Sequence, residues 1–350
     1  MRPSDLERLC DARITCGEAL RIGEAYLQGC GICDAAADAW LLFEFVTGMS
    51  RAHFLAERGA LAQQAAAARY RDLLLRRGAH IPLQHLTGEQ EFMGFPFYVN
   101  EHVLIPRQDT ETLVEEALKR LPIAKRFEMA AAPCRRTQVR GRYFSRPPIA
   151  KRFEMAAATC RRTKVRGRYF RVLDLCTGSG CIAVSLAKLG PDGAESQIPE
   201  EAGHVGVQID ATDISEAALA VARRNAKRNH AAVRLIQGDL FENVSGPYDM
   251  IVSNPPYIRT GVIAELDEEV RLHEPQLALD GHKDGLYFYR RIAGESGAYL
   301  KDGGFLLLEI GYDQSEAVEA LLREAGFEEI RTVKDLAGLD RVVCARKPCV

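Results

Sequence analysis

From residue 171 to the end of the chain, short apolar segments alternate with amphipathic ones. The apolar segments are expected strands, at residues 172–175, 207–212, 233–237, 248–253 and 304–310. Helical spacing of apolar residues marks 181–189, 216–229 and 314–326. Strands that alternate with helices predict an α/β fold with a mostly parallel, doubly wound sheet. Two last segments, 328–333 and 341–345, are expected to pair at its end, with an antiparallel terminal strand.

Four of the expected strands end in turns that contain glycine or polar residues. In chain order these turns hold Gly178 and Gly180, then Asp213, then Asp239 and Leu240, and finally Asn254. A doubly wound sheet binds its ligands at the carboxyl ends of its strands. The four turns are therefore expected to meet at one site.

The first three turns suit a nucleoside. Glycines let the backbone approach a ligand closely, and an acid at the end of the second strand can accept from a ribose hydroxyl pair. Asp239 and Leu240 suit an adenine, with the acid near its amine and the apolar side chain against its face. Taken singly, the glycine turn is not a dinucleotide fingerprint, and either aspartate is as well explained as a helix cap. The ordered series is more specific.

The fourth turn, Asn254-Pro255-Pro256-Tyr257, offers hydrogen-bond acceptors beside an aromatic ring. Neither proline has an N–H to donate, and Pro256 favours an extended Pro255. The side-chain oxygen of Asn254 and the carbonyl of Pro255 can together accept both hydrogens of a planar –NH2 group. An exocyclic base amine and a side-chain amide both fit. Asn-Pro is also an ordinary turn signal, so the motif alone leaves a purely structural turn open.

The pattern of the first 75 or so residues predicts helices, and none of these residues shows a catalytic motif. Helical patterns cover 16–28, a segment that begins after Asp34 and 61–77, and an aromatic, β-prone segment at 92–99 suggests a hairpin. Asp109 or Thr110 is expected to cap a helix that runs to Lys119. Cys30 and Cys33 have metal-ligand spacing but lack a second pair, so no metal site is expected.

A duplicated basic segment lies between the two halves. Residues 122–144 recur as 148–170 with two differences, and residues 122–171 carry 15 Lys and Arg against two Glu. The net charge of the whole chain is −2, so the remainder carries −15. The insertion is interpreted as a tandem duplication in a surface loop. Arg-rich sequence with Tyr and Phe can bind RNA, so any nucleic-acid contact is expected only there.

The composition is ordinary for a globular protein, with 47% hydrophobic and 27% charged residues. No stretch is long and apolar enough for a membrane span, and the N-terminus lacks a signal-peptide core, so a cytoplasmic protein without membrane contact is expected. The ten cysteines are scattered and are interpreted as reduced thiols. A monomer is expected.

The series of turns, with further motifs around it, resembles the S-adenosylmethionine-dependent protein-glutamine N5-methyltransferases that modify peptide chain release factors, the HemK/PrmC family. The resemblance runs from about Asp34 to the C-terminus. It is carried by residues 82–89, 104–107, 174–180, 254–257, 274–280, 284–286, 303–309 and 335–338. Cys176 stands where glycine is common, Gln108 where proline or serine is usual, and the basic duplication is not a family feature.

The resemblance implies a helical substrate-docking domain at 1–78, a β-hairpin linker at 79–106 and a Rossmann-like class I methyltransferase domain at 107–350, interrupted by the insertion at 122–170. S-Adenosylmethionine is the implied cofactor, and the glutamine of a Gly-Gly-Gln loop in a release factor the implied substrate. The implied cofactor contacts are Cys176, Thr177, Gly178, Ser179, Gly180, Asp213, Asp239, Leu240 and Asn254. The implied substrate contacts are Arg107, Asn254, Pro255, Pro256 and Tyr257.

The implied reaction is N-methylation of an amide, with Asn254, Pro255 and Tyr257 as the catalytic residues. Two acceptors on the amide N–H bonds hold the nitrogen toward the methyl donor, and no strong general base is evident. Three alternatives stay open: glutamine methylation of a ribosomal protein, N-methylation of a nucleic-acid base, and a non-catalytic RNA-binding adaptor. The acidic body argues against the nucleic-acid substrate.

Overall fold

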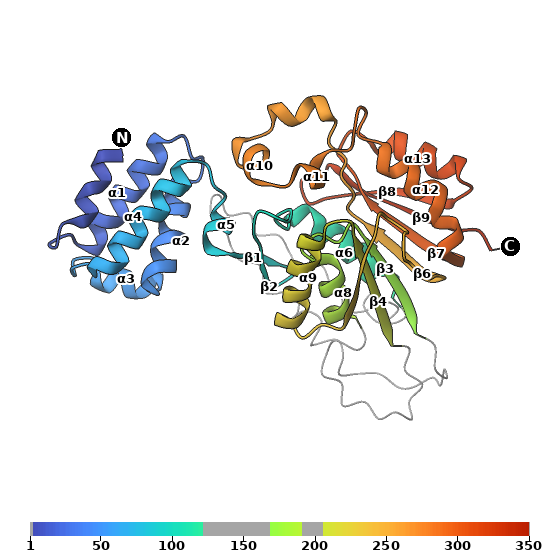
Figure 1. The fold of residues 1–350 in the computed structure, drawn as a ribbon, viewed down its shortest axis with the longest axis horizontal. Coiled ribbons are helices and arrows are strands. Elements are labelled where there is room, and N and C mark those ends of the chain that lie inside the picture. The colour runs from blue at the N-terminus through green and yellow to red at the C-terminus, as the bar shows by residue number, and fades with distance from the viewer. Residues whose placement is uncertain (1–2, 122–168, 191–205, 350) are drawn as a thin grey trace, which may run out of the picture. The chain divides into compact units, whose positions relative to one another are not determined.

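The computed structural model describes residues 3–121, 169–190 and 206–349, which fall into two compact units (Figure 1). The first comprises residues 1–89 together with 266–274, and the second comprises 90–265 and 275–350. The duplicated basic segment lies outside the described residues, except for its last two positions, and so does the loop at 191–205. The two units are described separately.

The first unit is a small helical bundle. Its elements are η1 (Pro3–Cys10), α1 (Cys16–Gly29), α2 (Ala35–Thr47), α3 (Arg51–Glu57), α4 (Gln64–Gly78), α5 (Leu83–Thr87) and α10 (Glu268–His273). Thr15 caps α1 in a capping box with Glu18, whereas Asp34 makes no side-chain cap on α2. The aromatic core of the bundle brings Trp40, Phe43 and Tyr70 together.

A buried arginine fastens α10 into this bundle. Arg77 is 4% exposed and donates from Nε to Asp38 Oδ2 at 2.6 Å and from a second nitrogen to Glu269. Charges this deep require partners, and breaking one such pair is costly. The segment at 266–274 therefore belongs to the helical unit, although it follows the Asn254–Tyr257 motif in the chain.

The second unit is built on a seven-stranded sheet. Its strands are β3 (Phe170–Leu175), β4 (Val207–Asp213), β5 (Val233–Gln237), β6 (Tyr248–Ser253), β7 (Leu300–Glu309), β8 (Glu328–Lys334) and β9 (Asp340–Arg346). Their order is β5-β4-β3-β6-β7-β9-β8. Only β9 runs antiparallel to its neighbours, β7 and β8. The expected doubly wound sheet, with an antiparallel last strand, is confirmed.

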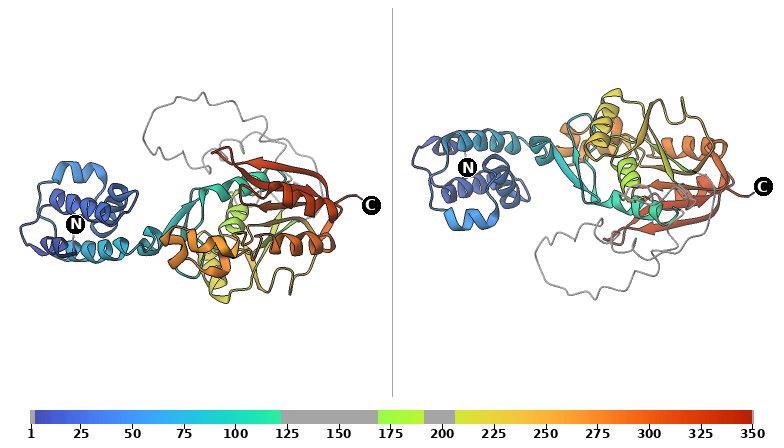
Figure 2. Two further views of the ribbon diagram at one scale, coloured as in Figure 1. Left: turned by 90° about the horizontal axis from the view of Figure 1, so that it is seen from above. Right: turned by 90° about the horizontal axis from the view of Figure 1, so that it is seen from below.

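Helices cover both faces of this sheet (Figure 2). On one face α6 (Glu111–Leu118) and α8 (Cys181–Leu189) pack on Val172 and Val252. On the other face α12 (Tyr287–Tyr299) and α13 (Ser315–Glu324) pack on Leu173 and Ile251. Successive residues of one strand thus point to opposite helical layers, as a buried parallel sheet requires. α9 (Glu216–Arg228) contributes Ala226 to the first layer.

Several local predictions need adjustment. The hairpin forms as β1 (Glu89–Phe92) and β2 (Phe95–Tyr98), close to its predicted place. The predicted cap of α6 is right in position, since Thr110 is the N-cap residue, but Thr110 makes no side-chain capping bond, and a 3₁₀ turn, η2 (Gln108–Thr110), leads into the helix. The Thr110 side chain instead contacts Asn254.

Three short elements occupy the chain between β6 and α12, namely η5 (Thr260–Glu265), α10 and α11 (Gln276–Leu279). Among the described residues no helix has the length and apolar character needed to cross a membrane. The eight cysteines in the described part of the chain are all free thiols.

Candidate functional site

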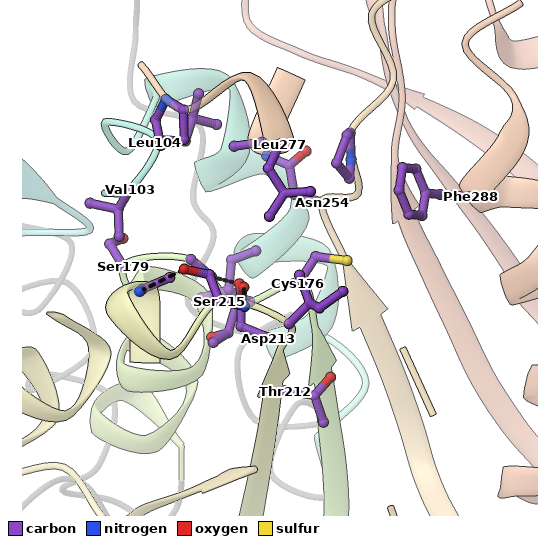
Figure 3. Close-up of a pocket in the computed structure, with 18 of the residues that line it drawn as sticks. Val103, Leu104, Cys176, Ser179, Thr212, Asp213, Ser215, Asn254, Leu277 and Phe288 are labelled. Atoms are coloured by element: carbon purple, nitrogen blue, oxygen red, sulfur yellow. Dashed lines mark hydrogen bonds between the residues drawn. The ribbon is translucent and has the colours of Figure 1, made fainter. Parts of the chain in front are cut away.

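A cavity of about 300 Å³ opens at the carboxyl ends of β3, β4 and β6 in the second unit (Figure 3). The chain runs from β3 outward through β4 to β5, then returns to β6 on the other side of β3. The cavity therefore lies at the point where strand order reverses, the usual ligand position in such sheets. Predicted site residues that line it are Arg107, Cys176, Thr177, Gly178, Ser179, Asp213, Asp239, Leu240, Asn254 and Pro256.

The turn after β3 requires an unusual backbone. Cys176, Gly178 and Gly180 have φ of 59°, 53° and 80°, in the left-handed region that L residues other than glycine rarely adopt. This conformation explains why glycine is common at the position of Cys176. Burial raises the pKa of the Cys176 thiol well above its ordinary value, so the group is a neutral thiol there.

The two glycines of the turn serve different purposes. A Cβ on Gly180 would lie 3.1 Å from Cβ and 3.2 Å from Cα of Ala222, so Gly180 allows α9 to approach the turn. A Cβ on Gly178 would meet nothing within 4 Å, so the backbone at Gly178 borders open space. Gly180 is not among the cavity-lining residues, and its part in the site is to place the turn.

Asp213, at the end of β4, accepts hydrogen bonds from two backbone segments that border the cavity, the turn after β3 and the loop before α9. Its Oδ2 accepts from the N–H of Gly178 at 2.8 Å and its Oδ1 from the N–H of Ser215 at 2.9 Å. Each carboxylate oxygen keeps further acceptor capacity. Burial raises the pKa of Asp213, while these backbone donors act in the opposite direction. These two hydrogen bonds fix the orientation of the side chain (Figure 3).

Asp239, after β5, is held by a cation that the sequence analysis did not single out. The Nη1 atom of Arg291, on α12, lies 3.0 Å and 2.8 Å from the two carboxylate oxygens of Asp239. A carboxylate engaged in this way retains lone pairs for an amine, but its position is set by α12. Leu240, beside it, is buried with a φ of 53° and lines the cavity.

Asn254 reaches the cavity from the end of β6. Its Nδ2 donates to Thr110 Oγ1 at 3.3 Å. Within the described residues, no hydrogen bond is made to Asn254 Oδ1 or to the carbonyl of Pro255. Ser253, the last residue of the strand, donates from Oγ to Leu175 O at 2.9 Å and ties β6 to β3. The predicted pair of acceptors is therefore held in place and available.

Two glycines pack closely against the backbone of Tyr257, and a glutamine donates a hydrogen bond to it. A Cβ on Gly281 would lie 2.7 Å from Cα of Tyr257, and a Cβ on Gly285 2.5 Å from its carbonyl oxygen. Gln314 Nε2 donates to the same oxygen at 3.0 Å. Burial raises the pKa of the Tyr257 hydroxyl far above its ordinary value, so the group stays protonated. Tyr257 and Pro255 do not line the cavity, and lie beyond Asn254 and Pro256 in the motif.

Two groups of lining residues were missed by the sequence analysis. One lies between the hairpin and α6, and includes His102, Val103, Leu104, Pro106 and Thr110. The other lies at and after α11, and includes Pro275, Ala278, Tyr287 and Arg291. Leu277 and Phe288 belong to the same group and are labelled in Figure 3. Each group is partly covered by motifs that resemble the family, at residues 104–107 and 274–280, so part of the signal was present without a role attached to each residue.

Comparisons with known proteins match both halves of the chain. Residues 18–88 match the model of the PrmC N-terminal domain, and residues 161–270 match that of the methyltransferase small domain. A release factor glutamine methyltransferase from Geobacter sulfurreducens is 37% identical over 322 residues, 92% of this chain and 93% of that one. The chain belongs to the release factor glutamine methyltransferase family. The family expected from the sequence motifs is confirmed.

Two further relatives agree. The release factor glutamine methyltransferase of Caulobacter vibrioides is 38% identical over 326 residues, 92% of each chain. That of Bordetella pertussis is 39% identical over 307 residues, 87% of this chain and 92% of its own. The structure is accordingly a Rossmann-like class I methyltransferase fold preceded by a helical region.

Proposed function

We propose that this protein transfers a methyl group from S-adenosylmethionine to the side-chain amide nitrogen, N5, of the glutamine in the Gly-Gly-Gln loop of peptide chain release factors. The observation that carries the proposal is the pair of available acceptors at Asn254 Oδ1 and Pro255 O, at the edge of a cavity suited to a nucleoside. Membership of the release factor glutamine methyltransferase family supports this substrate over others.

The residues of the cavity fit S-adenosylmethionine. Asp213 presents a fixed carboxylate for the ribose hydroxyls, and Leu240 a buried apolar side chain for the adenine face. The bare backbone at Gly178, and the turn from Cys176 to Gly180, leave room for the amino acid part. When bound, the cofactor supplies an electrophilic methyl group on a sulfonium.

The chain's own contribution is to hold the amide. An amide nitrogen is a weak nucleophile because its lone pair is delocalised into the carbonyl. Asn254 Oδ1 and Pro255 O accept from its two N–H bonds, which orients the nitrogen and stabilises the positive charge that develops on it. Pro256 and Tyr257 exclude water on one side. Arg107 lines the cavity beside Thr110 and is assigned to substrate binding.

Partners and location follow from the substrate. A release factor is the partner, docked by the helical region at residues 1–78, with the hairpin at 79–106 as linker. The enzyme acts as a cytoplasmic monomer, where translation factors are found. The basic segment 122–170 is an insertion in the methyltransferase domain and the only place for nucleic-acid contact.

The test compares three substrates in parallel. Purified enzyme with methyl-labelled S-adenosylmethionine is offered a release factor, a ribosomal protein and RNA, and the labelled product is digested and mapped by mass spectrometry. We expect label only on the release factor, on the glutamine of the Gly-Gly-Gln loop, and none when that glutamine is replaced by alanine. Preferential labelling of the ribosomal protein or the RNA would overturn the assignment.

A further inference from the structure

Glu309, the last residue of β7, lies beside the Asn254 motif in the sheet. The strands β6 and β7 pair in parallel with Ser253 opposite Leu308, so the residues that follow each of them are also neighbours. Glu309 is only 2% exposed. It does not line the cavity, and none of the roles assigned above uses it. A carboxyl group buried next to a reacting centre requires an explanation.

The carboxyl of Glu309 is not neutralised by a close cation. The guanidinium of Arg341, on β9, acts electrostatically on this carboxyl, but its own ion pairs are with Asp335 at 3.1 Å and Asp109 at 3.3 Å. Its contact with this strand end is a hydrogen bond from Nη1 to the carbonyl of Ile310, at 3.3 Å. In the described part of the chain Oε2 of Glu309 has no hydrogen-bond partner. Electrostatic pairing therefore does not account for the residue.

Two neutral donors do contact the carboxyl: the side chains of Thr110 and Asn254. Asn254 Nδ2 also donates to Thr110 Oγ1, so the three side chains form a closed group. An ionised carboxylate only accepts hydrogen bonds. The Thr110 hydroxyl must then donate to Glu309, which leaves its oxygen to accept from Asn254. The Asn254 amide nitrogen thus contacts both the Thr110 hydroxyl and the Glu309 carboxyl.

We propose that Glu309 is a positioning residue for methyl transfer: with Thr110 it holds the Asn254 amide in the single orientation that presents Oδ1 to the substrate nitrogen. The two ends of an asparagine amide have nearly the same shape, so packing alone does not choose between them. An ionised carboxylate favours one of the two orientations, because in the flipped amide the Oδ1 acceptor would point at the carboxylate and be repelled by it. This inference rests on the proposed function, in which Oδ1 accepts from the substrate.

Protonation of Glu309 removes this selection, because a carboxylic acid can donate to Oδ1 of the flipped amide. Burial raises the pKa of Glu309 to about 7, and the negative charge of Asp109 raises it further. Hydrogen bonds from Thr110 and Asn254 and the positive charge of Arg341 act in the opposite direction and lower the pKa. Tyr257 and Tyr289 also interact electrostatically with this carboxyl, and the Tyr289 hydroxyl donates to the backbone carbonyl of Glu309 at 2.8 Å. Burial raises the pKa of both hydroxyls far above the ordinary value, so both stay neutral. Activity is thus expected to need the ionised form.

The test replaces Glu309→Gln, which keeps the shape and can donate to Oδ1. We expect kcat with a release factor to fall by about 10- to 100-fold, as for a misplaced catalytic group. The KM for the release factor and the calorimetric Kd for S-adenosylmethionine should change less than about threefold. Wild-type kcat should rise between pH 6 and 8, by up to about tenfold per pH unit below the pKa, and the variant should lack that rise.

Two companion variants separate positioning from folding. Thr110→Val removes the hydroxyl and should lower kcat like Glu309→Gln, whereas Thr110→Ser keeps it and should stay near wild type. Glu328→Gln, an exposed position on the sheet's edge strand, is the matched control and should leave kcat and its pH profile unchanged.

Wild-type kcat and pH profile in Glu309→Gln would overturn the inference while leaving the proposed function intact. A loss of kcat accompanied by an equal loss of cofactor affinity would also overturn it, because that pattern marks a structural role. A wild-type enzyme that binds S-adenosylmethionine but does not methylate release factors would overturn the proposed function, and this inference with it.

Discussion

The carboxylate of Asp213 accepts a 2.8 Å hydrogen bond from the backbone N–H of Gly178, so the end of β4 fixes the turn that follows β3. The same side chain reaches the N–H of Ser215 in the loop before α9. One acid therefore sets the relative position of the two loops that form the floor of the cavity. Its remaining lone pairs are the proposed ribose acceptors.

Replacing Asp213→Asn should weaken the binding of S-adenosylmethionine. The amide keeps one acceptor oxygen but loses the charge, and a hydrogen bond to a charged group is worth about 1.5–3 kcal/mol. Calorimetry should then give a Kd about 10- to 100-fold higher. Glu216→Ala, an exposed acid on α9, is the control and should bind normally. An unchanged Kd in a folded Asp213→Asn protein would exclude Asp213 from the cofactor site.

The conformation of Cys176 makes a prediction about its replacements. At a φ of 59° glycine is free of strain, whereas a β-branched side chain is a genuine outlier. Cys176→Gly should change the unfolding free energy by less than about 1 kcal/mol and retain cofactor binding. Cys176→Val should cost about 1–2 kcal/mol or more and weaken binding. Equal stability of the two variants in urea denaturation would contradict the strained turn.

Buried acids predict how stability depends on pH. Burial raises the pKa of Asp174 from 3.8 to about 7, although Thr177 Oγ1 donates to its Oδ2 at 2.6 Å. The folded state therefore binds a proton that the unfolded state releases. This contribution to stability is fully present below about pH 4 and is lost as pH rises through 7.

Asp174→Asn should reduce the fall in unfolding free energy between pH 5 and 8 by at most about 3 kcal/mol, because about two pH units of the shift lie in that range. Urea denaturation at several pH values measures this quantity. Asp72→Asn, whose side chain is 63% exposed, should keep the wild-type dependence. A pH dependence in Asp174→Asn that matches wild type would show that Asp174 is ionised in the folded protein across this range.

Deleting residues 122–147 leaves one copy of the basic repeat and should change methylation of a free release factor by less than about threefold. The family resemblance continues on both sides of the insertion, and a longer loop adds only a slowly growing closure cost. A large loss at moderate salt would place the repeat in the active enzyme. A loss seen only with RNA-containing complexes, and abolished by salt, would indicate electrostatic steering.

Most of the sheet was predictable because buried parallel strands are continuous apolar runs bounded by turns. The strands β4, β5 and β6 lie within a residue or two of their predicted bounds. β7 begins four residues earlier than predicted, since Lys301 and Asp302 break the apolar pattern without ending the strand. Thr110 is the N-cap residue of α6 as predicted but makes no capping bond, because a local signal cannot anticipate a partner such as Asn254, 144 positions away.

In the candidate site, too, some features could be predicted from the sequence and others depend on long-range packing. Strand ends were predictable from the order of strands and turns, and ten of the predicted residues do line one cavity. The pairing of Asp239 with Arg291, and the burial of Glu309 next to Asn254, depend on which helices and strands pack together. The end of the fifth strand carries an acid, as the ends of the second and third do, and that pattern was the available signal for Glu309.

The most direct test of the central claim is the turnover of Asn254→Ala on a release factor, followed by mass spectrometry of the Gly-Gly-Gln peptide. In the proposed mechanism Asn254 accepts from the substrate amide, so kcat should fall about 100-fold or more, while the melting temperature and the affinity for S-adenosylmethionine stay close to wild type. Near-normal methylation of the glutamine by Asn254→Ala would contradict the account.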